Sequence, residues 1–182
     1  MAKSPLRSFF VLLLLGVALL TIALVVRSGI AARKNPGQPL NQYMRAALDA
    51  KNVPELTTDE EKEIEKRFPG VRLLPSGLRY VLRRAGDGPR AQQGQEVVVN
   101  YDGRLLTGGK FDSSYDRGVP FTFRVGLGQV VKGWDEAFLE MKKGERRTLI
   151  IPYWLAYGEQ GRPPLIPSRA TLVFEVELLD IR

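Results

Sequence analysis

The chain has no cysteine and no histidine among its 182 residues. The absence of cysteine excludes disulfide bonds, thiolate metal sites and cysteine nucleophiles. The absence of histidine excludes Ser-His-Asp and Cys-His catalysis, histidine-containing zinc sites and a histidine pH switch. Any chemistry must therefore come from carboxylates, hydroxyls, amides or the shape of an apolar surface, and we expect neither a metal nor a cofactor.

The length and composition fit one packed domain with additional segments, because 44% of the residues are hydrophobic and two large domains would need a longer chain. The net charge is +7 and the sequence pI is about 9.8. The lysines and arginines are spread along the chain and interleaved with acidic residues rather than gathered into blocks. We therefore expect no nucleic-acid partner.

Residues 9–26 form the longest charge-free apolar run of the sequence. As a helix this run would be roughly 27 Å long, which just spans the hydrocarbon core of a bilayer. It is also longer than the usual hydrophobic region of a signal peptide, and the residues after it offer only a weak cleavage site. We predict that residues 1–34 are an N-terminal membrane anchor, with a cleaved signal segment as the alternative.

The orientation of this predicted anchor follows less directly from charge, because two basic residues precede the run and three follow it. The short N-terminal flank resembles a bacterial signal-anchor, which would leave the rest of the chain outside the cytoplasm. We therefore predict a protein of the bacterial inner membrane with its C-terminal domain in the periplasm. Release into the periplasm after cleavage is the alternative.

Residues 35–74 are rich in Pro, Gly, Gln, Asn and charged residues, and contain two short stretches with helical spacing. The first lies near residues 40–50. The second opens with Thr58 and Glu61 at the spacing of a capping box and ends before Pro69. Both are too short and polar to fold alone, so we interpret residues 35–74 as a charged, partly helical linker. A docking or dimerisation element is the alternative.

Residues 75–182 alternate apolar and polar positions in a way that predicts several antiparallel strands and one helix. The predicted strands are residues 78–83, 96–105, 110–114, 121–125, 145–151 and 170–179. In the helix, Trp134, Ala137, Phe138 and Met141 share one face, and Lys142 to Gly144 supply a stop signal. The pattern predicts an α+β domain whose curved antiparallel sheet wraps around one short helix.

Aromatic residues gather at the ends and inward positions of these elements. The set is Tyr101, Phe111, Phe121, Phe123, Trp134, Tyr157 and Phe174. A core needs some of them, but so many hydroxyl-bearing and corner-placed rings favour a binding site. Asp112 is the only acid embedded among them, and taken alone it fits a turn cap as well as a site residue. Trp134 could likewise be a core contact or the floor of a pocket.

Five blocks of the sequence are similar to successive motifs of the FK506-binding proteins, which are peptidyl-prolyl cis-trans isomerases. They occur in the family's order over roughly residues 76–182, and only their combination is specific. The blocks are residues 99–103 (VNYDG), 109–114 (GKFDSS), 130–134 (VVKGW), 155–158 (LAYG) and 166–178.

This resemblance implies a half-barrel sheet around the helix with a shallow hydrophobic pocket between them. It makes Trp134 the pocket floor, Tyr101 a wall, and Asp112 and Tyr157 the polar rim, and these four are the candidate catalytic residues. The Tyr157 hydroxyl and the Val131 backbone N–H would donate hydrogen bonds to a bound ligand. The candidate substrate-binding residues are Phe111, Phe121, Val130, Val131, Ile166, Phe174 and Arg117, of which Arg117 would contact the aspartate.

The sequence departs from the family pattern at Gln129, at Arg162 and at residues 152–154, which puts substrate and drug preference in doubt more than activity. The implied partners are proline-containing polypeptides and FK506- or rapamycin-like macrolides. The implied function is prolyl isomerisation that assists folding of extracytoplasmic proteins. The alternative is a membrane-tethered module that binds proline-containing segments, or acts as a chaperone or scaffold, without useful turnover.

Overall fold

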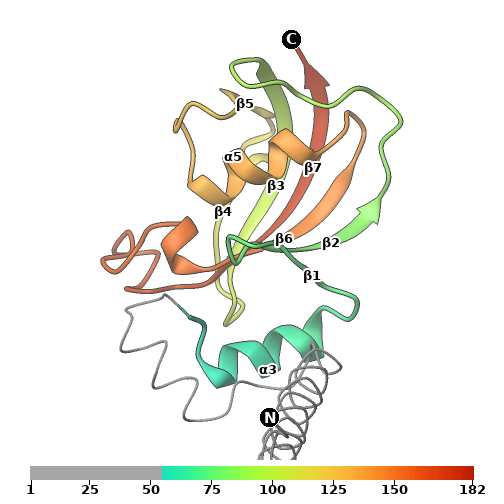
Figure 1. Ribbon diagram of the computed structural model, residues 1–182. Helices are drawn as coiled ribbons and strands as arrows, with labels where there is room; N and C mark the ends of the chain where they lie inside the picture. The colour runs from blue at the N-terminus through green and yellow to red at the C-terminus, as the bar shows by residue number, and fades with distance from the viewer. Residues whose placement is uncertain (1–54) are drawn as a thin grey trace, which may run out of the picture. The chain divides into compact units, whose positions relative to one another are not determined.

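The computed structural model describes residues 55–182, which form one open, curved antiparallel sheet with helices on its two faces (Figure 1). Seven strands pair in the order β1-β2-β6-β7-β3-β4, and β5 also pairs with β3. The strands are β1 (Arg72–Leu73), β2 (Arg79–Arg84), β3 (Glu96–Leu105), β4 (Lys110–Ser113), β5 (Phe121–Arg124), β6 (Arg146–Ile151) and β7 (Leu172–Ile181).

The two ten-residue strands β3 and β7 are the centre of the sheet. Strand β3 alternates buried and partly exposed residues as predicted, because Val97, Val99 and Tyr101 face the core. Its second edge is shared, since β5 pairs with its first half and β4 with its second half. Register shifts in β3 against β4 and β7 interrupt these ladders, as bulges do in sheets that bend.

Helix α5 (Lys132–Glu140) lies across one face of this sheet and buries the face that the sequence predicted (Figure 1). Trp134, Ala137, Phe138 and the capping residue Met141 are all buried in the main core. Gly133 permits the close packing, because a Cβ there would lie 2.6 Å from Cγ2 of Ile151 on β6. The predicted stop differs: the cap is Met141 in extended conformation, and Gly144, with φ +87°, belongs to the turn into β6.

Helix α3 (Thr58–Arg67) covers part of the opposite face of the sheet. A second buried cluster joins residues around the helix to the outward side chains of the sheet. Its members are Leu56, Ile64, Phe68, Leu106, Ile150 and Val173. The predicted capping box is present but one residue earlier, since Thr57 is the N-cap and Glu60 the reciprocal partner.

Two hydrogen bonds attach α3 to distant parts of the sheet. The Thr171 hydroxyl donates to the Glu60 carboxylate at 2.7 Å, and the Arg67 guanidinium donates to the Leu106 carbonyl. Residues 54–182 accordingly cluster as one compact unit. Helix α3, which lies in the segment predicted to be a linker, therefore packs with the sheet, because its few apolar residues enter the second cluster. The predicted domain bounds stay a prediction.

The predicted strands are present within one or two residues of their bounds. Three short elements were not predicted: β1, α4 (Ser114–Arg117) and the 3₁₀ helix η1 (Tyr153–Leu155). With α3, the two short helices mean that the sheet carries more than the single predicted helix. The predicted anchor and the predicted helix at residues 40–50 lie outside the described residues. Within residues 55–182, no helix is long and apolar enough to cross a membrane.

Candidate functional site

Trp134 is the centre of an aromatic cluster on the α5 face of the sheet. Its ring centroid lies 5.0 Å from that of Tyr101, 5.2 Å from Phe174 and 5.3 Å from Phe138. Phe123 and Phe121 complete the cluster at 5.7 and 6.1 Å. Most of these pairs meet edge to face, the geometry that aromatic rings prefer.

The indole of Trp134 is almost completely covered, since the residue is only 4% exposed. Its Nε1–H is nevertheless buried without a hydrogen-bond partner among residues 55–182. A buried unpaired donor costs free energy, and such groups are rare in folded proteins. An unsatisfied N–H inside an aromatic cluster is consistent with a ligand site rather than with a purely structural core.

Asp112 holds a polar network at the edge of this cluster. The Tyr101 hydroxyl donates to Oδ2 of Asp112 at 2.5 Å, while Oδ1 accepts from the Arg117 guanidinium and from the Ser113 backbone N–H. Arg117 also donates to the Tyr101 hydroxyl at 2.8 Å. Pairing of β4 with β3 brings Asp112 opposite Gly103, and the short helix α4 returns Arg117 to the same place.

The network fixes the protonation states of its members. Burial raises the pKa of Asp112, but the hydrogen bonds from Tyr101 and Arg117 outweigh it and lower the pKa below its ordinary value. Burial, and then the bond to Asp112, raise the pKa of the Tyr101 hydroxyl. Asp112 is therefore a carboxylate and Tyr101 a neutral phenol at physiological pH, and neither is available to exchange a proton.

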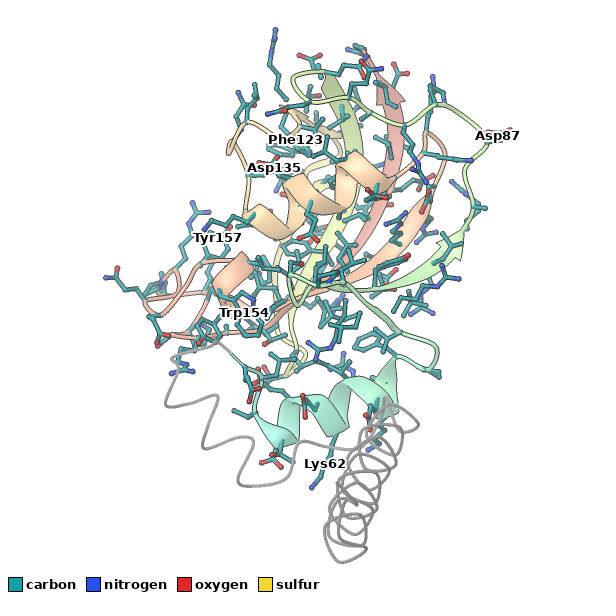
Figure 2. The ribbon with its side chains drawn as sticks, viewed as in Figure 1. Lys62, Asp87, Phe123, Asp135, Trp154 and Tyr157 are labelled. Atoms are coloured by element: carbon teal, nitrogen blue, oxygen red, sulfur yellow. The ribbon has the colours of Figure 1, made fainter. Side chains whose placement is uncertain are left out.

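A groove of about 410 Å³ opens beside Asp112. Asp112, Phe111 and Tyr157 line one part of it, and the loop of residues 162–166 lines the rest. The Tyr157 hydroxyl has no hydrogen-bond partner within the described part of the chain, so it is free to donate to a ligand. Figure 2 labels Tyr157 beyond the 3₁₀ helix η1, which leads the chain to this position.

The structure brings the eleven predicted site residues together in two adjoining parts. Phe111, Asp112, Tyr157 and Ile166 line the groove, while Tyr101, Trp134, Phe121 and Phe174 form the aromatic cluster. The two parts meet where the Phe111 and Phe174 rings pack 5.5 Å apart. Val130 and Val131 are partly buried against the main core, and the Arg117 guanidinium forms an ion pair with the Asp112 carboxylate. Their individual roles remain predictions.

Two residues that the sequence did not single out position these side chains. Asp135 on α5 (Figure 2) accepts hydrogen bonds from the backbone N–H groups of Gly126 and Gly128, both at 2.8 Å, and so ties the loop before Val130 to the helix. The buried Ser114 hydroxyl accepts from the Tyr101 backbone N–H at 2.9 Å. Nothing in the sequence around Asp135 indicates that its carboxylate would bind the backbone of the preceding loop.

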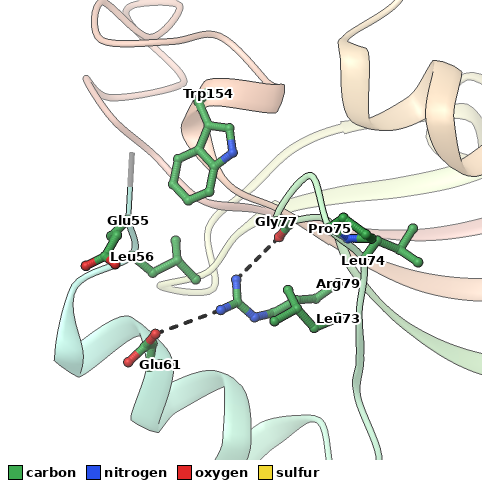
Figure 3. Close-up of a pocket in the computed structure, with 9 residues that line it drawn as sticks. All are labelled: Glu55, Leu56, Glu61, Leu73, Leu74, Pro75, Gly77, Arg79 and Trp154. Atoms are coloured by element: carbon green, nitrogen blue, oxygen red, sulfur yellow. Dashed lines mark hydrogen bonds and ion pairs between the residues drawn. The ribbon is translucent and has the colours of Figure 1, made fainter. Parts of the chain in front are cut away.

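A second cavity, of about 420 Å³, lies away from all of these residues (Figure 3). It opens between α3, the segment after β1 and the indole of Trp154. Arg79 spans it, with Glu61 3.9 Å away and the Gly77 carbonyl accepting from the guanidinium. It contains no predicted site residue. Residues 55–182 contain no group of three acidic side chains placed to hold a metal ion.

Comparison with known proteins agrees with the arrangement of this site. A family model described as FKBP-type peptidyl-prolyl cis-trans isomerase matches residues 88–179. The crystal structure of AtFKBP13 superposes with a TM-score of 0.60 and 41% sequence identity, covering 62% of this chain and 98% of that one. The fold and the five motifs therefore lead to the same family.

Relatives of known sequence come from both bacteria and eukaryotes. Peptidyl-prolyl cis-trans isomerase FKBP2 of Mus musculus is 52% identical over 62% of this chain and 79% of its own length. Peptidyl-prolyl cis-trans isomerase Mip of Coxiella burnetii is 46% identical over 64% of this chain and 50% of its own length. FK506-binding protein 4 of Dictyostelium discoideum is 48% identical over 66% of this chain, which spans only 33% of that protein.

The predicted isomerase domain is thus confirmed at the level of family, whereas the bacterial origin and the membrane anchor stay predictions. The chain belongs to the FKBP-type peptidyl-prolyl cis-trans isomerases.

Proposed function

We propose that this chain accelerates cis–trans isomerisation of X-Pro bonds in polypeptides by twisting the prolyl amide at the site of Trp134, Asp112 and Tyr157. The uncatalysed reaction faces a barrier of about 18–20 kcal/mol from amide resonance, and no bond need be broken. The observation that carries the proposal is the apolar aromatic cluster directly beside an immobilised polar network.

The aromatic cluster supplies the first part of the mechanism. A planar amide is more polar than the twisted transition state, so an apolar surface that removes water from the prolyl amide favours the twist. Trp134 and its neighbouring rings supply that surface, and their dense edge-to-face packing keeps it in place. The pocket needs to bind the twisted amide more tightly than either planar isomer.

The polar groups supply the second part. The free Tyr157 hydroxyl can donate to a carbonyl that rotates away from the amide plane. Asp112 acts as a fixed negative charge and not as a base, because its oxygens are occupied by Tyr101, Arg117 and Ser113. Since these bonds exist before a peptide binds, no reorganisation is required during the reaction.

The test is a proline-limited peptide isomerisation assay on residues 55–182, which keep α3. We expect a rate above that of buffer, a lower rate for Tyr157→Phe and for Asp112→Ala, and competitive inhibition by FK506. Wild-type rates equal to buffer would contradict the enzyme, and partner capture that persists after catalysis is lost would favour the binding module. FK506 titration also tests our proposal that macrolides of this kind bind the same site.

We also propose that the apolar run at residues 9–26 tethers the domain to the bacterial inner membrane, where it assists folding of extracytoplasmic proteins from the periplasmic side. The length of the run and its lack of charge support this proposal. Protease treatment of intact spheroplasts should degrade the domain, and the mass of the mature chain should include residues 1–34. A shortened mature chain in the soluble periplasmic fraction would support the cleaved signal instead.

A further inference from the structure

Arg162 is a positively charged side chain on the wall of the substrate groove that no described residue neutralises. It lines the groove together with Asp112, Tyr157 and Leu165. Its guanidinium carbon lies 5.8 Å from the centre of the Tyr157 ring. It forms no ion pair within residues 55–182, whereas Asp112, the other charged residue of the groove, is paired with Arg117.

Of the two charged residues that line the groove, Asp112 and Arg162, only Asp112 has an ion-pair partner in the described part of the chain. Asp112 is paired with Arg117 on one side of the groove. On the loop that leads to Arg162, Glu159 is paired with Arg169 at 3.6 Å. A peptide lying in the groove therefore meets one uncompensated charge, and that charge is positive.

The backbone holds Arg162 in this place. Two hydrogen bonds, of 2.8 and 3.0 Å, join its backbone to that of the buried residue Ile166. Gly161, directly before it, has φ +69°, and a Cβ there would lie 2.2 Å from the Pro167 carbonyl oxygen. Only glycine fits this turn, so the loop presents Arg162 at a defined position rather than at a freely moving tip.

We infer that Arg162 sets a preference for X-Pro segments in which an acidic side chain flanks the proline. The inference rests on the proposed isomerase function, because the charge acts on a peptide held in the same groove. An exposed Arg–carboxylate pair is weak, so we expect a preference of only about two- to five-fold in kcat/KM for glutamate over glutamine. The preference should decrease in about 1 M salt, where screening acts over ~3 Å.

The test uses the full chain in detergent with pairs of proline tetrapeptides that carry Glu or Gln directly before, or directly after, the proline. The measured quantity is the Glu/Gln ratio of kcat/KM within each variant. We expect a ratio of about two to five for at least one position in the wild type, a ratio near one for Arg162→Gln, and a retained ratio for Arg162→Lys. Arg72→Gln is the matched control, because Arg72 is exposed on β1 outside the groove and its loss changes the net charge equally.

Two outcomes separate the inference from the function on which it rests. If no peptide is isomerised faster than in buffer, the proposed function itself fails. If all peptides are accelerated but the ratio is near one at both positions, or is unchanged in Arg162→Gln, the function holds and the assigned role of Arg162 is overturned.

Discussion

The two tryptophans of this chain lie in opposite settings. Trp134 is buried on the α5 face with its N–H unpartnered within the described residues. Trp154 packs with the α3 cluster, and its N–H donates to the Ser76 carbonyl at 3.0 Å. The α3 face therefore holds a tryptophan whose N–H is satisfied, whereas the α5 face, where the site is predicted, holds one that is more deeply buried and, among residues 55–182, unpaired.

The largest expected effect is a loss of stability caused by a mutation on the α3 face. Ile64→Ala removes the most buried side chain of α3 and should lower the free energy of unfolding by about 2–5 kcal/mol. Folded protein should keep its kcat/KM, since Ile64 does not touch the site. Urea denaturation and the peptide assay measure the two quantities. The control is Glu65→Ala, an exposed neighbour expected to change stability by less than about 0.5 kcal/mol.

The opposite result is expected for the polar network of the site. Asp112→Ala leaves Tyr101 and Arg117 without their shared acceptor and should lower kcat/KM about tenfold, or ~1.4 kcal/mol of transition-state stabilisation. The melting temperature should change little, because the carboxylate is partly exposed. Asp116→Ala removes a neighbouring acid that pairs with Lys110 instead, and serves as the control. Equal losses in both variants would argue against a specific role for Asp112.

A smaller effect comes from exchanging each tryptophan for phenylalanine. Trp154→Phe loses the hydrogen bond to Ser76 and should cost about 1 kcal/mol of stability with no change in kcat/KM. Trp134→Phe loses no hydrogen bond but should reduce both kcat/KM and FK506 affinity. Denaturation and inhibitor titration of the two variants are the measurements. A loss of catalysis in the Trp154 variant would break the division between the two faces.

The smallest effect is expected from pH. Because the pKa of Asp112 is lowered in the folded protein, its interactions are complete above the ordinary aspartate pKa of ~3.9 and are lost only as pH falls through the lower folded value. Activity should therefore be flat from about pH 5 to 8. Rate measurements with tryptophan fluorescence as a folding control test this, and Asp112→Asn should remove any acid loss that precedes unfolding. A bell-shaped profile near neutral pH would require a titrating group that the site does not show.

Strands that bury one face were predictable from sequence, and segments defined by long-range packing were not. Strand β3 has the predicted bounds, and Val97, Val99 and Tyr101 enter the core at every second position. Helix α3 carries only one buried residue within its bounds, so its amphipathic signal was too weak to reveal that it packs on the sheet. Its capping box was predicted one residue too late, because Thr57 with Glu60 and Thr58 with Glu61 have the same spacing in the sequence.

The candidate site could be predicted from the sequence mainly because the five motifs occur in the order found in the family. Asp112, Tyr101 and Arg117 are close because β4 pairs with β3 and α4 turns back, and no local pattern in the sequence encodes that meeting. Asp135 illustrates what even the motifs omit, since its carboxylate binds backbone groups and leaves no side-chain partner to identify. The near-complete cover over Trp134 likewise depends on how five rings pack together.

Strand β6 contributes buried side chains to the clusters on both faces of the sheet. Its residues from Arg147 to Ile151 are all buried, because Leu149 and Ile151 enter the α5 core while Ile150 enters the α3 cluster. A strand without a solvent side cannot separate from one layer and remain in the other. The two layers should therefore melt in a single transition. A mutation that loosens α3 should also increase local opening around the candidate site, and amide hydrogen exchange in β6 would measure that opening.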